Sequence, residues 1–179
     1  MASVIGRRIG WKDMETSVVW PGRSLDRINW SGAELVLSAA HNSESLSHDL
    51  ARLESERHVM VVGMTQKEDL SESIEPLLDS EGRIRIIVTE VHGGRSPSVN
   101  AELLSEYLSV DSEEPALIIT EPIEAIDTAS KKASEEGCIV YVTGSVYLVG
   151  QALEEMVSRE NGNLWEYLEA HRPREQTEV

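Results

Sequence analysis

The sequence predicts an α/β protein built on an open, mostly parallel, Rossmann-like sheet with helices on both faces. From residue 33 onward, short β-rich runs alternate with segments of helical periodicity. Several of these runs are almost continuously apolar, as expected of strands that are covered on both faces. Strand-helix alternation with short connections is typical of a parallel sheet. We expect about five or six strands, and five of them are the runs 33–38, 58–64, 83–90, 116–120 and 138–143.

Helical spacing is present in four segments between and after these strands. Their apolar residues recur at intervals of three and four, which places them on one face of a helix. They are Leu46, Leu50 and Leu53; Leu70, Ile74, Leu77 and Leu78; Ile123 and Ile126; and Val149, Leu153 and Met156. The residues expected to cap these helices are Asn42, Asp69 (in a capping box with Glu72), Thr120 and Ser145.

The length and composition fit one domain with short extensions, because 179 residues that are 40% hydrophobic suffice for one core. We assign this domain to residues 18–160. Its start is less regular, with Pro21-Gly22 as a turn between two short strands. Residues 1–17 are interpreted as a linker or the end of another domain, and residues 161–179 as a helical extension and a charged tail.

Charge and composition disfavour several classes of function. The formal net charge of −16 opposes binding to nucleic acid or to an anionic membrane, and Lys131-Lys132 is followed closely by Glu135-Glu136. No apolar run approaches the roughly 20 residues that span a bilayer. The first residues lack a secretory signal, so we expect a cytoplasmic protein. The single cysteine, Cys138, lies in an apolar run and is expected to be a buried apolar residue rather than a catalytic thiol.

Three junctions between a strand and the next helix carry residues that could bind a ligand at the carboxyl edge of the sheet. Residues 38–43 include His41, which could contact an anion or a transferring group, or could be a loop histidine bonded to the backbone. Residues 142–150 include Ser145, which could bind a carboxylate or only cap its helix. Residues 93–97 form a glycine-rich loop with one cation, and such surface loops are usually inert.

Several other kinds of site are disfavoured by spacing. The five histidines show no metal-ligand spacing, so we predict no metal site. Neither Gly-x-Gly-x-x-Gly nor Gly-x-x-x-x-Gly-Lys-Ser/Thr occurs, and Gly-x-Ser-x-Gly is also absent. A nucleoside triphosphate would therefore need a phosphate cradle from elsewhere.

Five short motifs together resemble the third, Mur-ligase-like domain of folylpolyglutamate and dihydrofolate synthases. Residues 20–23 (WPGR) are similar to the motif that opens that domain, and residues 37–42 (LSAAHN) to its Leu-Asp-Gly-Ala-His-Asn. Residues 61–64 (VVGM) resemble its strand ending Phe-Gly-Met, and Arg95-Ser96 its Arg-Ser/Ala loop. The most specific match is residues 142–150 (VTGSVYLVG), close to Val-Thr-Gly-Ser-Leu-Tyr-Leu-Val-Gly.

The resemblance implies a domain of a three-domain ligase that uses ATP and Mg²⁺ to activate a folate or pterin carboxylate as an acyl phosphate, which the amine of glutamate then attacks. In such enzymes the central domain carries the phosphate loop and the magnesium ligands, so little should bind tightly here without it, in cis or in trans. Arg23 and Ser38 fall on ATP-contacting positions, His41 on a histidine near the reacting groups, and Ser145 and Tyr147 on the motif close to glutamate.

The chain departs from this pattern at the nucleotide contacts. Ser38 replaces an aspartate and Ala39 a glycine, while the acidic-lysine-acidic run after Gly-Met becomes residues 67–69 (KED). We expect a detached ligase domain that is inactive alone. The alternatives are a non-catalytic binding or regulatory module that keeps the fold, and a structural interaction domain. If the site survives, Arg23, His41 and Ser145 should line one open, concave surface that could hold an anion.

Overall fold

In the computed structural model, which describes residues 22, 27–110, 114–160, 162–164 and 166, six strands form one sheet in the order β1-β2-β6-β3-β4-β5. The strands are β1 (Arg27–Trp30), β2 (Ala33–Leu37), β3 (His58–Val62), β4 (Arg83–Val88), β5 (Leu117–Ile118) and β6 (Ile139–Thr143). Only β1 pairs antiparallel among these strands; all the other pairs are parallel. The predicted fold class is confirmed.

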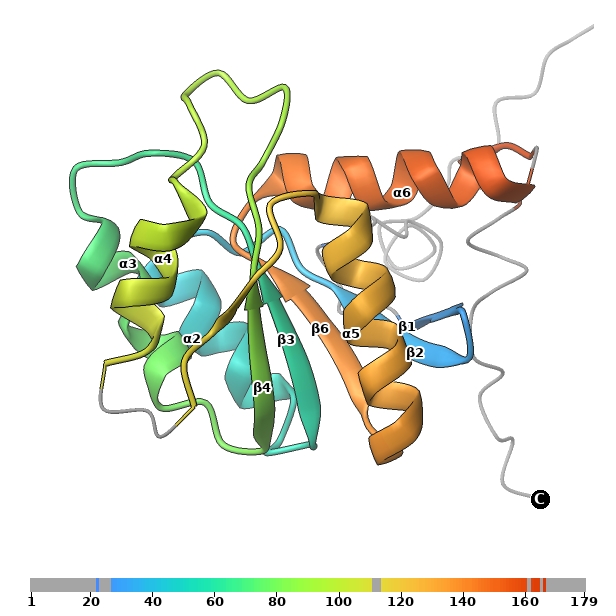
Figure 1. Cartoon of the computed structure of the whole chain (residues 1–179), viewed down its shortest axis with the longest axis horizontal. Coiled ribbons are helices and arrows are strands. Elements are labelled where there is room, and N and C mark those ends of the chain that lie inside the picture. The colour runs from blue at the N-terminus through green and yellow to red at the C-terminus, as the bar shows by residue number, and fades with distance from the viewer. Residues whose placement is uncertain (1–21, 23–26, 111–113, 161, 165, 167–179) are drawn as a thin grey trace, which may run out of the picture.

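The helices of the described region cover both faces of the sheet (Figure 1). They are α2 (Ser43–Arg52), α3 (Leu70–Leu78), α4 (Ala101–Leu108), α5 (Pro122–Glu136) and α6 (Val146–Glu160). One core packs α5 and α6 against the sheet, and a second core packs α2, α3 and α4 against the opposite face. Along β6, Val140 and Val142 enter the first core while Ile139 and Tyr141 enter the second, because side chains alternate along a strand.

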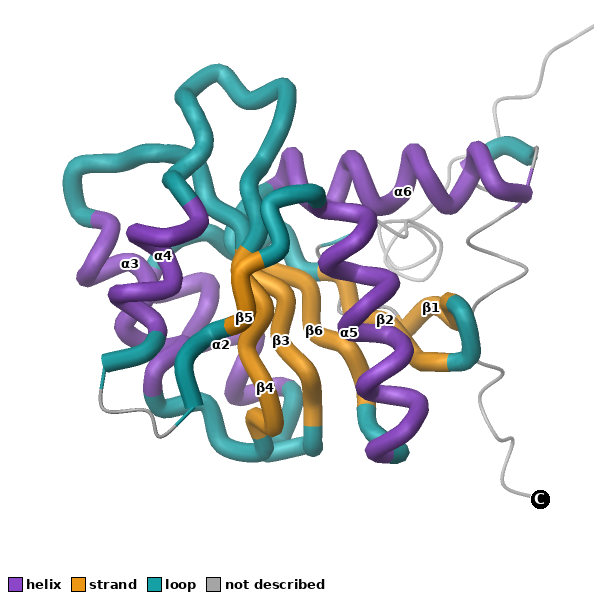
Figure 2. Tube along the Cα trace, in the orientation of Figure 1, coloured by secondary structure: helices purple, strands orange, loops and turns teal. Residues whose placement is uncertain are grey.

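A tight hairpin joins β1 to β2 (Figure 2). Its two turn residues, Ser31 and Gly32, have φ of 47° and 84°, as in the two-residue turns that match the twist of antiparallel strands. Trp30 anchors this hairpin to the helices on the same face. Its Nε1 donates to Asp127 Oδ1 of α5 at 2.9 Å, and the guanidinium of Arg159 lies 4.4 Å from the centre of its ring. β1 is one of the two short strands expected on either side of Pro21-Gly22; the other prediction falls on residues outside the described part of the chain.

The strands are shorter than predicted, most of all the run 116–120, of which only Leu117–Ile118 pairs. β5 lies at one edge of the sheet and bonds to β4 alone. Its two residues are 39% and 40% exposed. The strand is short because it has a partner on one side only and little of its apolar surface is buried.

Two of the four predicted caps are wrong. Asp69 precedes α3 with φ −106° and ψ 38° and makes no side-chain cap bond, since a capping side chain needs an extended backbone. Thr120 does not cap α5 either: Glu121 holds the N-cap position and Pro122 is the first helical residue. Asn42 does cap α2, in a reciprocal capping box with Ser45.

Cys138 is half-buried and packs against the core that contains α5 and α6. Burial raises the pKa of its thiol, which keeps it in the unreactive form expected from the sequence. In the described part of the chain, no helix is long and apolar enough to cross a membrane.

Candidate functional site

The topology places a crevice at the carboxyl ends of β2 and β6. These strands are neighbours, but the chain leaves β2 for α2 on one face of the sheet and leaves β6 for α6 on the other. Open parallel sheets bind ligands at such switch points. A pocket of about 360 Å³ lies here, lined by Gly22, Ala39, Ala40, His41, Asn42, Ser45, Asp49 and Val146.

A second hollow of about 390 Å³ lies elsewhere, between α2 and α3. It includes His58 at the start of β3 and Ser80 just before β4, so it opens near the amino ends of these strands. The carboxyl-edge pocket is the better candidate site, because helix amino termini and the loops after the strands surround it.

Backbone hydrogen bonds hold the two loops of the switch point together. Ser38 N–H donates to Val142 O at 2.9 Å, and Gly144 N–H donates to Ala40 O at 2.9 Å. Ala39 N–H donates to Gly22 O at 2.6 Å, which brings the end of the Trp-Pro-Gly motif to the same place. Three of the motifs that were separate in the sequence therefore meet in one wall of the pocket.

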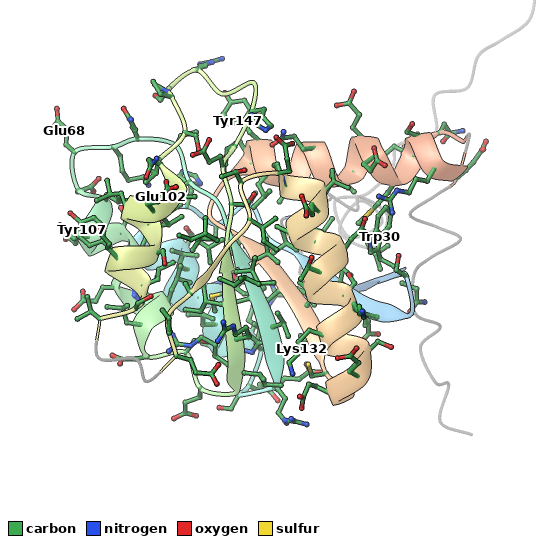
Figure 3. The ribbon with its side chains drawn as sticks, viewed as in Figure 1. Trp30, Glu68, Glu102, Tyr107, Lys132 and Tyr147 are labelled. Atoms are coloured by element: carbon green, nitrogen blue, oxygen red, sulfur yellow. The ribbon has the colours of Figure 1, made fainter. Side chains whose placement is uncertain are left out.

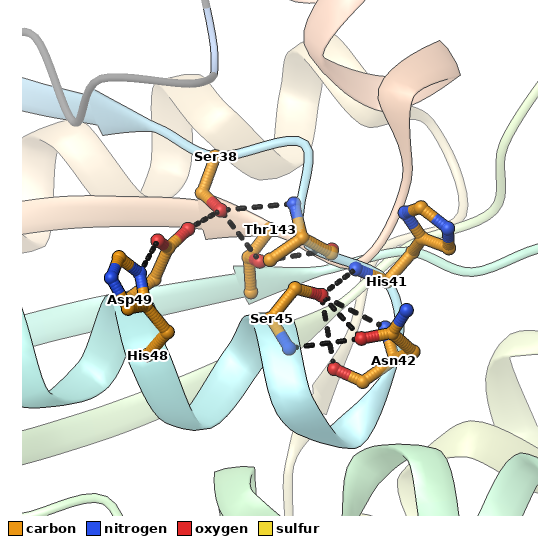
Figure 4. Close-up of polar contacts among 8 residues, drawn as sticks. Ser38, His41, Asn42, Ser45, His48, Asp49 and Thr143 are labelled. Atoms are coloured by element: carbon orange, nitrogen blue, oxygen red, sulfur yellow. Dashed lines mark hydrogen bonds and ion pairs between the residues drawn. The ribbon is translucent and has the colours of Figure 1, made fainter.

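Ser38 lies beneath the pocket and is completely buried. Its Oγ accepts from Ala40 N–H at 3.1 Å and lies 3.4 Å from Thr143 Oγ1 (Figure 4). Its own proton goes to Asp49 Oδ2 of α2, at 2.5 Å. Asp49 was not among the residues singled out in the sequence, although it lies three residues after Leu46 and four before Leu53, on the inward side of α2.

Tyr141 adds a third hydroxyl to this buried group. Its side chain is completely buried, and its hydroxyl lacks a hydrogen-bond partner of good geometry among the described residues. Burial raises the pKa of Tyr141 to about 12, an effect that the nearby hydroxyls of Ser38 and Thr143 partly oppose. The group is therefore a neutral set of hydroxyls placed against the single carboxylate of Asp49.

His41 is exposed at the rim of the pocket and its ring is bonded to the backbone, which is one of the two interpretations considered from the sequence. Its contact with a ligand stays a prediction. His41 Nδ1 lies 2.9 Å from Ala39 O; because a carbonyl only accepts, Nδ1 is the donor, and in the neutral imidazole Nε2 is then an acceptor. Lys67 Nζ donates to the carbonyl oxygen of His41, and burial lowers the pKa of that lysine. This contact ties the loop after β3 to the rim.

Ser145 and Tyr147 begin α6 on the other side of the crevice. Ser145 is 3% exposed, and its Oγ accepts from Tyr147 N–H at 3.2 Å. It therefore caps the helix, which is one of the two roles considered from the sequence. Tyr147 is half-buried beneath the loop that follows β4 (Figure 3). A Cβ placed on Gly94 of that loop would lie 3.5 Å from Tyr147 Cδ2. Roles of Ser145 and Tyr147 in binding glutamate stay predictions.

The loop of residues 91–100 is held on both sides. Gln66 N–H donates to Pro97 O at 2.8 Å, and His92 N–H donates to Gln151 Oε1 of α6 at 3.2 Å. Arg95 is exposed on this loop. Arg23 lies outside the described residues, so its predicted place beside His41 and Ser145 stays a prediction.

The described residues provide no cluster of three or more His, Cys, Asp or Glu side chains that could hold a metal ion.

Comparison with known proteins gives one family and many similar folds. The model of the family described as "Dihydrofolate synthetase, C-terminal domain" matches residues 23–155. No curated protein sequence matches significantly. Among solved structures, E. coli FolC in complex with ADP is similar over 88% of this chain and 37% of its own, with TM-score 0.69 and 22% identity. The folylpolyglutamate synthase of Mycobacterium tuberculosis, complexed with ADP and AMPPCP, is similar over 78% and 33%, with TM-score 0.66 and 22% identity.

The Thermotoga maritima folylpolyglutamate synthase is similar over 84% of this chain and 34% of its own, with TM-score 0.64 and 21% identity. At these identities the structural matches support the fold alone. The chain spans about a third of the length of each of these structures.

Proposed function

The chain belongs to the family of dihydrofolate synthetase C-terminal domains, and we propose that it serves as such a domain in an ATP-dependent ligase that joins glutamate to a folate or pterin carboxylate. The observation that carries the proposal is the meeting of residues 38–42 and 142–147 at one pocket, through the 2.9 Å bond from Gly144 N–H to Ala40 O. These two segments contain the most specific motifs of the resemblance.

In the proposed reaction, ATP supplies the phosphoryl group that activates the acceptor carboxylate, and the amine of glutamate displaces it. His41 presents Nε2 at the rim, where it would accept a hydrogen bond from the incoming amine and orient its lone pair. The amino terminus of α6, with Ser145 and Tyr147, would receive a glutamate carboxylate, because a helix amino terminus favours anions. Arg23 would contact ATP through its guanidinium.

We further propose a division of labour between this domain and a central ATP-binding domain, in cis or in trans. The 179 residues contain no Gly-x-x-x-x-Gly-Lys-Ser/Thr loop, and phosphoryl transfer needs a backbone cradle, a lysine and a held metal ion. The central domain would hold the phosphates and Mg²⁺, while this domain would close over them in the cytoplasm. This chain matches only about a third of each similar structure, which leaves room in such a structure for a separate ATP-binding domain. This coverage supports the division.

A domain replacement tests the proposal. The C-terminal domain of E. coli FolC is exchanged for this chain, and ADP release and glutamate addition are measured with a dihydropteroate or folate acceptor. We expect no turnover by this chain alone, turnover by the chimera, and a large loss when the chimera carries His41→Ala. Acceptor-dependent ADP release by the purified chain alone would contradict the division of labour.

A non-catalytic ligand-binding or regulatory module is the second candidate, and one observation favours it. Ser38 stands where the resemblance has an aspartate, and its hydroxyl is buried and engaged by Asp49. Such a module would bind nucleotide or glutamate but leave the chimera inactive even when the chimera is folded and binds its acceptor. Turnover by the chimera would exclude it.

A further inference from the structure

Asp49 is a mostly buried carboxylate that lines the carboxyl-edge pocket. Its side chain is 14% exposed, and it reaches the pocket from the second turn of α2. The imidazole of His48 lies beside it, with Nδ1 3.4 Å from Asp49 Oδ1, and the His48 side chain is 69% exposed. An ionised carboxylate can accept about four hydrogen bonds, so Asp49 retains acceptor capacity towards the pocket.

The direction of the hydrogen bond at Ser38 shows how Asp49 is held. The Ser38 hydroxyl has one proton, its oxygen already accepts from Ala40 N–H, and an ionised carboxylate only accepts. The proton is thus left for Asp49 Oδ2, at 2.5 Å. Since Ser38 is completely buried, it acts through Asp49 rather than by touching a ligand.

The walls of the pocket favour a ligand that donates hydrogen bonds. Besides Asp49, the rim offers the acceptor Nε2 of His41, and the small side chains of Ala39 and Ala40 leave room for a ring. The carboxylate repels phosphate groups but can accept from both hydroxyls of a vicinal diol. These two acceptors therefore suit the sugar of a nucleotide better than its phosphates.

We propose that Asp49 binds the ribose hydroxyls of the nucleotide and that Ser38 is a positioning residue that aims Asp49 at the pocket. The inference rests on the proposed function for the identity of the nucleotide. The carboxylate that faces the pocket then lies on α2, one hydrogen bond away from residue 38, where the resemblance has an aspartate. Nucleotide contact is then retained despite the serine at that position.

The test compares ADP with 2′,3′-dideoxy-ADP, by NMR titration or calorimetry of the purified chain at up to millimolar nucleotide. Wild-type chain should prefer ADP by about 10- to 100-fold, the range expected when a hydrogen-bonded pair with a charged acceptor is lost. Asp49→Asn should weaken ADP binding by a similar factor and leave dideoxy-ADP nearly unchanged. Ser38→Ala should produce a smaller loss with the same dependence on the diol. Glu44→Gln removes a charge from the same helix outside the pocket and should change neither affinity.

The outcomes separate this inference from the proposed function. If the wild-type chain binds ADP and dideoxy-ADP equally, or Asp49→Asn weakens both equally, the inference is overturned and the nucleotide role stands. If Asp49→Asn weakens glutamate binding instead, Asp49 holds an ammonium group and the inference is likewise wrong. If the wild-type chain binds no ADP at millimolar concentration, this domain has no nucleotide site of its own and the inference is overturned, whereas turnover by the chimera would still support the proposed function. The analogue comparison on wild-type chain decides the matter even if Asp49→Asn does not fold.

Discussion

Gly144 marks the point where the loop after β6 crosses the loop after β3, and an alanine there should disrupt that crossing. The φ of Gly144 is 104°, and an added Cβ would lie 2.7 Å from Gly63 O and 3.0 Å from Met64 Cγ. Gly63 cannot move away freely, because its N–H donates to Thr143 O at 3.2 Å. The backbone conformation alone costs a non-glycine residue about 1–3 kcal/mol, and the contact adds to it. We expect Gly144→Ala to lower the free energy of unfolding by about 2–4 kcal/mol.

Gly150 provides the matched control, because it lies inside α6 and a Cβ there would meet nothing within 4 Å. Gly150→Ala should stabilise the protein by about 0.5–1 kcal/mol through helix propensity. Thermal and urea unfolding followed by circular dichroism measure both variants. For a domain of this size, 1 kcal/mol shifts Tm by about 2–4 °C, so Gly144→Ala should lose roughly 5–15 °C. Equal Tm values for the two variants would refute the reasoning from close approach.

Three further variants test other contacts. Arg159→Ala removes a guanidinium that stacks on Trp30 and pairs with Asp127. We expect the free energy of unfolding to fall by about 1–2 kcal/mol. A double-mutant cycle with Asp127→Ala should assign most of this loss to the pair. Burial lowers the pKa of His58, so the unfolded chain binds its proton more readily and stability should fall as pH drops below about 6.5; urea titrations should show a weaker pH dependence in His58→Gln. Tyr141→Phe removes a buried hydroxyl without a well-placed partner and should leave stability unchanged or raise it by about 1 kcal/mol, whereas a loss above 1 kcal/mol would mean that Ser38 or Thr143 bonds to it.

Much of the fold could be predicted from the spacing of apolar residues along the sequence and from composition. The continuous apolar runs predicted β3 and β6 because both faces of these strands are covered, and every residue of each strand is buried. The run 116–120 is similarly apolar, but it lies at the edge of the sheet and only two of its residues form a strand. Its length could not be predicted because local composition does not determine the order of strands in a sheet. The caps at Asp69 and Thr120 failed for a related reason: capping depends on the backbone conformation of one residue, which the residue type only biases.

The site was predictable where it coincides with a motif and not where tertiary packing creates it. His41 lies at the end of a strand, so the parallel sheet alone brings it to the carboxyl edge. Asp49 lies in the middle of a helix, beside Leu50, and either residue could face the sheet by helical spacing from Leu46. Packing turned the carboxylate inward and left Leu50 only half-buried. A polar residue inside an apolar helical stripe is the signal that would have identified it.

The distribution of charge argues that the proposed reaction needs a basic partner surface. ATP, glutamate and an acyl phosphate are anionic, yet the chain carries a formal charge of −16. In the described part, the loops that follow the strands at the carboxyl edge carry two cationic side chains, Lys67 and Arg95. Lys67 is bonded to the carbonyl of His41, which leaves Arg95 as the exposed one. Even together with Arg23, which we propose to contact ATP, these cations are too few to stabilise the transferring phosphoryl group. We therefore expect a basic complementing domain whose association in trans weakens steeply with added salt; affinity independent of ionic strength would show that apolar contacts, rather than charge, join the two.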